Sequence, residues 1–238
     1  MEPYLFHGVV LPERAQMSLQ FGLGFSNAAL GFEAEVKASI VLNQVAVWVD
    51  SEHVWDIFDL RNVVKGIVQD HLAMVGYLTG YAYEIEIFRV LNQSRNIDYV
   101  FGIDIPCLAE RGKSVDLQDA LPRLREKTLG PNGVFLRRCF SDLASSMKHP
   151  DDTAFYCYRA IESLLHHCAA VYGLSAAEKP KQWEKFREVS GCNEQTLRAI
   201  KAAADPLRHG GASGCSSDER AKLFTSTWSV VDGYLSGV

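Results

Sequence analysis

The sequence predicts an α+β fold in which a mainly antiparallel sheet with one packed helix precedes a bundle of five helices. Three observations support this class. Apolar residues in the first hundred positions repeat with the period of a strand, and those after residue 130 repeat with the period of a helix. Glycines and prolines crowd the stretch 106–133 between the two patterns. We therefore expect two domains, residues 1–130 and residues 131–238.

The first half contains segments rich in β-branched and aromatic residues, several of which alternate apolar and polar side chains. The expected strands are residues 17–25, residues 32–49 as two strands divided near Asn43-Gln44, residues 81–91, and residues 96–105. A helix is expected between these strand groups, from about residue 54 to residue 78, because its apolar side chains recur at helical spacing. We expect this helix to pack on one face of the sheet.

The second half shows five stretches of helical spacing, with a further short helix expected over 117–129 inside the boundary segment. Helix-start residues such as Asn193 and Ser216 and helix-stop glycines such as Gly173 and Gly191 fix their ends. The five expected helices of the bundle are residues 134–147, 153–172, 181–189, 193–209 and 216–235.

Composition places the chain among globular proteins. Its 238 residues are 47% hydrophobic and 22% charged, a usual balance for a folded domain. No stretch approaches the roughly 18 apolar residues of a membrane span, and the Met-Glu-Pro-Tyr start lacks the basic and apolar segments of a signal peptide. We expect a cytoplasmic protein without a membrane partner.

The net charge of −5 argues against broad non-specific binding of nucleic acid. The charge is uneven, however. Residues 1–130 contain 11 Lys and Arg against 17 Asp and Glu, and residues 131–238 contain 13 against 12. If RNA is a partner, the C-terminal half is the better candidate, although two ordinary surfaces of different composition would show the same totals.

Six cysteines are spread along the chain without a C-x-x-C motif. Cys157 and Cys168 would share one helix face beside His166 and His167, but a second pair at zinc-finger spacing is missing. Dinucleotide-binding, P-loop, nucleophile-elbow and zinc-protease motifs are also missing. We expect neither a metal nor a cofactor.

The segment Asp205–Gly211 is the first candidate site. Arg208 and His209 follow Pro206 at the end of the helix expected over 193–209, and Pro206 either kinks that helix or restarts it with Asp205 as the cap. An adjacent Arg and His could bind a phosphate or exchange protons. The alternative is that two cations stabilise the negative end of a helix dipole.

A second group lies on the helix expected over 153–172. Arg159, Glu162 and His166 follow at i, i+3 and i+7, so they form one row beside the core stripe. This row places an Arg, a carboxylate and an imidazole along the margin of a helix interface. An ordinary solvated row with one weak ion pair is the alternative.

These residues resemble the HEPN family of helical bundles. The resemblance rests on Tyr-Arg-Ala-Ile-Glu-Ser-Leu at 158–164 and on the basic-His-Gly ending at 208–210, and it covers about residues 133–236. It implies a homodimer formed through the helices that carry the motif. Many HEPN proteins are metal-independent ribonucleases of toxin, CRISPR and phage-defence systems, and others are non-catalytic binding or regulatory modules.

Active HEPN proteins carry an Arg separated by four to six residues from a His. Here His209 can take the His position, but no Arg stands at that spacing before it; Lys201 lies eight residues upstream and Arg198 eleven. The resemblance implies that His209 and Arg208 would carry the catalysis, with Glu162 orienting the imidazole of His209. It also implies that Lys201, Arg159 and His166 would bind RNA phosphates. The leading expectation is a HEPN-like ribonuclease effector whose N-terminal half senses a ligand or protein partner. The alternative is a non-enzymatic adaptor that acts through dimerisation and partner binding.

Overall fold

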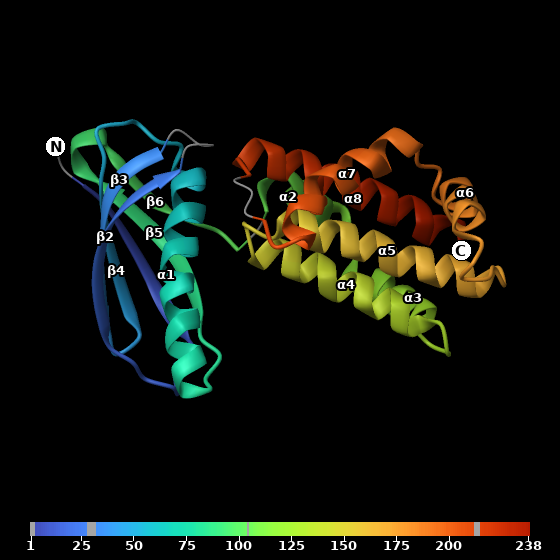
Figure 1. Cartoon of the computed structure of the whole chain (residues 1–238), viewed down its shortest axis with the longest axis horizontal. Helices are drawn as coiled ribbons and strands as arrows, with labels where there is room; N and C mark the ends of the chain where they lie inside the picture. Colours follow the sequence, from blue (N-terminus) through green and yellow to red (C-terminus); the bar gives the residue numbers. More distant parts are fainter. Residues whose placement is uncertain (1–2, 28–31, 104, 212–214) are drawn as a thin grey trace. The chain divides into compact units, whose positions relative to one another are not determined.

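The computed structural model describes residues 3–27, 32–103, 105–211 and 215–238. Its contacts divide the chain into two compact units, Met1–Ile103 and Asp104–Val238, and each unit contains its own hydrophobic core. The expected α+β class is confirmed, with the sheet in the first unit and a helical second unit (Figure 1). The division falls at Ile103, whereas the change in sequence character suggested residue 130.

The first unit is a six-stranded antiparallel sheet in the order β2-β3-β4-β1-β5-β6. A short 3₁₀ turn, Gln93–Arg95, joins the last two strands. The strands are β1 (Tyr4–Leu11), β2 (Leu19–Asn27), β3 (Phe32–Val41), β4 (Gln44–Asp50), β5 (Glu84–Asn92) and β6 (Ile97–Val100).

Strand β1 occupies the centre of the sheet, although the sequence pattern did not indicate it. It pairs with β4 on one side and β5 on the other. Its sequence, Tyr-Leu-Phe-His-Gly-Val-Val-Leu, is apolar at six positions and shows little alternation. Burial alternates along β1 between buried and partly buried positions, but the partly buried positions are mostly apolar as well (Leu5, Val9 and Leu11), so a search for alternating apolar and polar residues passes over it.

Helix α1 (Ile57–Thr79) packs on one face of this sheet (Figure 1), as expected. Asp56 caps its start by accepting hydrogen bonds from the backbone N–H groups of Phe58 and Asp59. The helix ends at Gly80, whose φ of +75° is a left-handed conformation that glycine adopts without strain. The residues of α1 that are buried against the sheet are Leu60, Val64, Ile67, Val68 and Leu72.

The turn between β3 and β4 uses the residue that the sequence placed there. Leu42 and Asn43 both have positive φ, 48° and 69°, the geometry of a tight hairpin turn. Asn43 is only 2% exposed. Its Oδ1 accepts from the N–H of Met17 at 2.7 Å, and its Nδ2 donates to the carbonyl of Val10 at 3.0 Å. One side chain thereby ties the turn to the end of β1 and the approach to β2.

The second unit is helical throughout its described residues. The five expected helices of the bundle correspond to α4–α8, the expected short helix corresponds to α3, and α2 was not expected. The helices are α2 (Pro106–Ser114), α3 (Leu117–Lys127), α4 (Gly133–Lys148), α5 (Thr153–Val171), α6 (Lys179–Ser190), α7 (Glu194–Arg208) and α8 (Ser217–Gly237).

Helix α5 is the centre of the second unit and contacts α4, α6, α7 and α8. Local signals fix the helices around it. Asn193 accepts from the N–H of Thr196 at the start of α7, and Ser216 forms a reciprocal capping box with Glu219 at the start of α8. Within the described residues, no helix combines the length and apolar character that crossing a membrane requires.

Candidate functional site

The structure brings Arg208 and Glu162 together. Helix α7 runs through Pro206 without a restart and ends at Arg208, so Asp205 lies inside the helix and does not cap a new one. The guanidinium of Arg208 lies 3.5 Å from the Glu162 carboxylate of α5 and 3.2 Å from that of Asp205. It also stands over the ring of Tyr158, 5.1 Å from the centroid. This cluster joins the end of α7 to the middle of α5.

The cluster is half-open to solvent. The side chains of Arg208 and Glu162 are 32% and 33% exposed, whereas Tyr158 beneath them is 4% exposed. Burial raises the pKa of the Tyr158 hydroxyl, and the nearby Glu162 carboxylate raises it further. Tyr158 is therefore a neutral platform at physiological pH. Arg208 already faces two carboxylates, so a phosphate would have to compete with them for it.

His209 directly follows Arg208 as the C-cap residue of α7, and it is exposed. Its backbone N–H donates to the carbonyl of Pro206 at 3.2 Å, and the N–H of Gly211 donates to the same carbonyl at 2.8 Å. Gly210 has a φ of +78°, which lets the chain leave the helix. The carboxylate of Glu162 forms an ion pair with Arg208. Among the described residues, no hydrogen bond or ion pair is found between Glu162 and the imidazole of His209.

Arg159 and His166 lie beside α4 and not beside α7. A guanidinium nitrogen of Arg159 is 3.0 Å from the carboxylate of Asp142 in α4. The ring of His166, which is exposed, stacks near that of Phe135 in α4 at 5.9 Å. The row Arg159-Glu162-His166 is thus split, because its outer members contact α4 and Glu162 contacts α7.

Asp142 is a residue that sequence reasoning missed. Its side chain is 6% exposed, and its second carboxylate oxygen is buried without a hydrogen-bond partner in the described structure. Burial raises the pKa of Asp142, and the charges of Arg159 and Arg138 oppose that rise. A signal was present, since Asp142 interrupts the apolar stripe that Leu136, Cys139 and Leu143 form along α4.

Lys201 lies on a groove of about 370 Å³ that α5, α6 and α7 enclose. We call this hollow the α6–α7 groove. Its lining combines apolar or aromatic side chains, which are Tyr158, Pro180, Trp183 and Leu197, with charged ones, which are Arg187, Glu194, Arg198 and Lys201. Arg198 is paired with Glu194. Within the described residues, no ion pair is found for Arg187 or Lys201.

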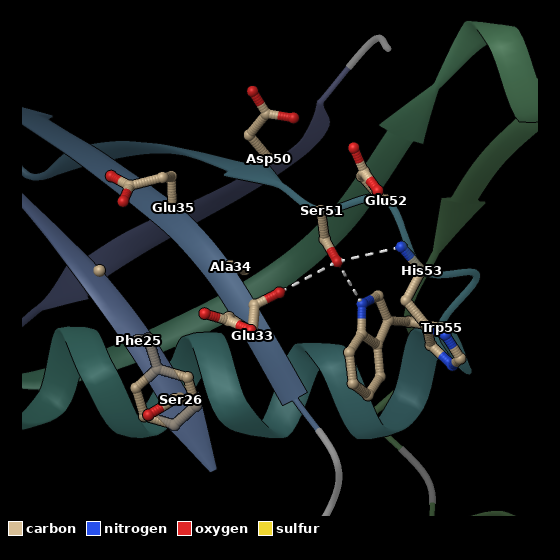
Figure 2. A pocket seen from close by; sticks show the side chains of 11 residues that line it. Phe25, Ser26, Glu33, Ala34, Glu35, Asp50, Ser51, Glu52, His53 and Trp55 are labelled. Atoms are coloured by element: carbon tan, nitrogen blue, oxygen red, sulfur yellow. Dashed lines mark hydrogen bonds between the residues drawn. The ribbon is translucent and has the colours of Figure 1, made fainter.

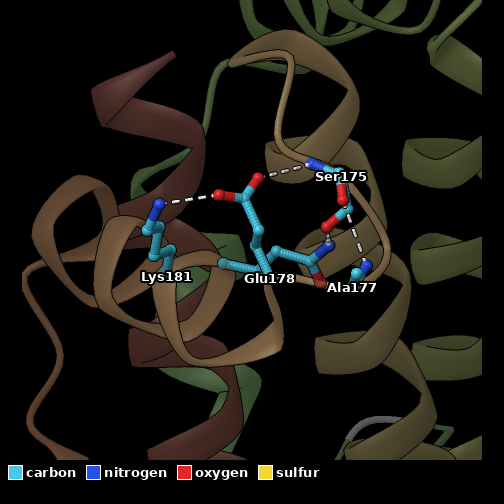
Figure 3. Close-up of polar contacts among 5 residues, drawn as sticks. Ser175, Ala177, Glu178 and Lys181 are labelled. Atoms are coloured by element: carbon cyan, nitrogen blue, oxygen red, sulfur yellow. Dashed lines mark hydrogen bonds and ion pairs between the residues drawn. The ribbon is translucent and has the colours of Figure 1, made fainter.

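Helix α6 carries Trp183 and Arg187. Its start is fixed by polar contacts with the preceding loop (Figure 3). Glu178 accepts from the N–H of Ser175 at 3.2 Å and from Lys181 at 2.7 Å, and the Lys181 hydrogen bond lowers the pKa of Glu178. The buried amide of Gln182 donates to the carbonyl of Ser175 at 2.7 Å. These bonds hold one wall of the groove in place.

The first unit contains a larger hollow, of about 580 Å³, at one end of β2, β3 and β4 (Figure 2). Ser51 organises it by accepting from the indole of Trp55 at 2.9 Å and donating to the carbonyl of Glu33 at 3.3 Å. The carboxylates of Glu35 and Asp50 lie on the opposite side of the sheet from the ring of Trp55, which packs against the core (Figure 2).

The sequence cluster of cysteine and histidine is not assembled into one site. Cys157 and Cys168 are buried in the core, and Nδ1 of the buried His167 lies 2.7 Å from the hydroxyl of Tyr234. Across the described ranges, no group of three or more His, Cys, Asp or Glu side chains is placed to hold a metal ion.

Comparison with protein families matches both units. Residues 4–101 match the model described as the N-terminal domain of a domain of unknown function, DUF8168. Residues 121–238 match the model of the C-terminal domain of the same family. Searches of curated proteins and of solved structures found no match. With both domain models matched in order along most of its length, the chain belongs to the DUF8168 family.

Proposed function

We propose that the second unit binds RNA and that the protein is a HEPN-like effector that cleaves RNA without a metal, of the kind found in phage-defence or toxin–antitoxin systems. The observation that carries the proposal is the meeting of Arg208 and Glu162 over Tyr158. This cluster lies beside the exposed His209, on the helix whose Lys201 borders the α6–α7 groove. Cations and an exposed imidazole at one helix end are the groups that phosphoryl transfer from RNA needs.

The proposed cleavage is an intramolecular transfer of the phosphoryl group within the RNA, so it needs no other reactant. The 2′-oxygen attacks the adjacent phosphorus while His209 takes the 2′-hydroxyl proton. The bond from phosphorus to the 5′-oxygen breaks, and the leaving oxygen receives a proton from a second imidazole. The products are a 2′,3′-cyclic phosphate and a 5′-hydroxyl. The second imidazole would be the His209 of a second copy, and Arg208 would exchange its carboxylate partners for the phosphorane oxygens.

The test is incubation of the purified protein with mixed RNA in EDTA. We expect cleavage that leaves cyclic phosphate ends, and a loss of at least about 100-fold in rate for His209→Ala, as for removal of a general acid or base. His53→Ala, which removes an exposed histidine from the first unit, should cleave like the wild type. A folded wild-type protein that cleaves no RNA would overturn the nuclease proposal.

A non-enzymatic adaptor is the second candidate, and one observation favours it. Glu162 and Asp205 already lie within 3.5 Å of Arg208, an arrangement that stabilises a helix junction without any substrate. In that case Glu162→Gln would change the oligomeric state or partner binding, measured by light scattering after gel filtration, and His209→Ala would change neither.

A further inference from the structure

We propose that the α6–α7 groove holds one unpaired base of a single-stranded RNA, with a neighbouring phosphate on Lys201 and Arg187. The inference deepens the proposed function, because it takes RNA as the ligand and names the form of RNA that is bound. It rests on the lining of the groove, to which His209 does not contribute.

The size and floor of the groove suit a nucleobase. A hollow of about 370 Å³ lies within the range of roughly 300–1,000 Å³ that small-molecule sites occupy. Trp183 is half-buried, and its ring meets that of the fully buried Phe186 edge-on at 5.9 Å. Pro180 and Leu197 complete an apolar surface. A rigidly held indole beside apolar walls is the kind of platform on which bases stack.

The charges of the groove suit a phosphate. Arg187 follows Trp183 by one helical turn on α6, and Lys201 approaches from α7. Arg198 is held by Glu194, whereas Arg187 and Lys201 have no ion pair among the described residues. Two cations without carboxylate partners, placed beside an apolar hollow, match the combination of base and phosphate in a nucleotide.

The form of the RNA follows from this geometry. A base in a duplex is stacked on both faces and paired at its edge, so it cannot enter a hollow, whereas unpaired bases can be splayed onto aromatic side chains. Tyr158 connects the groove to the candidate site, because it lines the groove and lies beneath Arg208. A strand anchored by one base in the groove would therefore have its next phosphates near Arg208.

Binding can be measured independently of cleavage. The probe is a fluorescein-labelled decamer of 2′-O-methyladenylate, in which no free 2′-hydroxyl can attack, and the readout is fluorescence anisotropy. The comparison strands are the same decamer annealed to its complement and an abasic decamer with the same phosphates. We expect the single strand to bind at least about tenfold more tightly than either, since stacking of one base gives a difference of that order.

The variants separate stacking from charge. Trp183→Ala should weaken binding of the single strand about tenfold or more and remove its preference over the abasic decamer, and Trp183→Phe should keep most of both. Trp228→Ala is the matched control, because Trp228 is a half-buried indole outside the groove. Lys201→Ala should make the slope of log affinity against log salt shallower by about 0.7, the value for one phosphate of a single strand. Arg123→Ala on α3 should leave that slope unchanged.

Two results would overturn the inference: equal affinity for the single strand, the duplex and the abasic decamer, or unchanged affinity in a Trp183→Ala protein that melts like the wild type. The fate of the nuclease proposal is separate. A protein that binds the single strand through Trp183 but cleaves no RNA retains the groove and loses the nuclease. If the protein cleaves RNA but its Trp183→Ala variant binds the single strand as tightly as the wild type, the nuclease proposal stands and the groove proposal fails.

Discussion

His167 places an imidazole inside the second core, where it is 7% exposed. Its Nδ1 lies 2.7 Å from the Tyr234 hydroxyl, and the two rings meet edge-on at 5.8 Å. Burial lowers the pKa of His167 below its usual 6.5, because a charged imidazole loses its hydration there. The folded state therefore favours the neutral ring.

This burial predicts a loss of stability in mild acid. The unfolded chain binds a proton at His167 as the pH falls through about 6.5, and the folded chain binds it only at lower pH. The free energy of unfolding attributable to this group is therefore full above that pH and falls below it. Urea unfolding measured from pH 8 to pH 5 should show a steeper decline for the wild type than for His167→Gln.

Tyr234→Phe is the control for this prediction. It removes the hydroxyl from a fully buried ring, which should cost about 1–3 kcal/mol at every pH because His167 loses its partner. The imidazole stays buried, so the decline toward pH 5 should remain as steep as in the wild type. If His167→Gln declines as steeply as the wild type, another group governs the acid response.

At the scale of elements, α6 and α8 approach each other closely at Gly233. A Cβ added at Gly233 would lie 2.1 Å from the backbone carbonyl oxygen of Ser190. Because this neighbour is backbone, it cannot rotate away as a side chain could. Gly112, in α2, is also helical, yet a Cβ there would meet nothing within 4 Å. The two glycines form a matched pair.

Gly233→Ala should destabilise the protein by about 1–3 kcal/mol, the usual cost of overpacking, even though alanine favours a helix by about 1 kcal/mol over glycine. Gly112→Ala should gain part of that helix preference and stabilise the second unit slightly. Thermal unfolding of both variants measures the difference. A neutral Gly233→Ala would mean that α6 and α8 can separate without loss.

The elements that the sequence predicted are those with local signals. Asn193 and the Ser216–Glu219 box begin α7 and α8, and each cap bonds only to its own first turn. Helix α2 is only nine residues long and contains Gly112, a residue that disfavours helix, so its stretch looked like a loop. Its position depends on Leu108, which packs against the core of other helices. Contacts of that kind cannot be read from local periodicity.

The candidate site likewise contains features that the sequence predicted and features that only the packing of the helices decides. Arg208 and Lys201 belong to one helix, and their placement on α7 followed from spacing. Trp183 comes from α6, and the partner of Arg159 proved to be Asp142 of α4. Which helices meet is decided by tertiary packing around α5, so the sequence could name the charged residues but not the groove that some of them line.

At the scale of the whole chain, the second unit begins before the helical stretch that the sequence marked. Helix α2 lies against α8, Ile105 and Leu108 pack on the second core, and Arg111 donates to the carboxylate of Asp232 at 2.9 Å. A domain cut at residue 130 removes these contacts, whereas a cut at residue 103 retains them. The two cuts therefore predict different stabilities.

A fragment of residues 104–238 should unfold cooperatively in urea, because it contains the whole of the second core. A fragment of residues 131–238 should be less stable by about 1–3 kcal/mol, since it exposes the surface that Ile105 and Leu108 cover. The Arg111–Asp232 pair is exposed and adds little to that difference.

Leu108→Ala in the longer fragment should reproduce part of the loss, and Leu117→Ala on α3, whose side chain is exposed, should reproduce almost none. Equal stabilities of the two fragments would place the boundary at residue 130, where the sequence first put it.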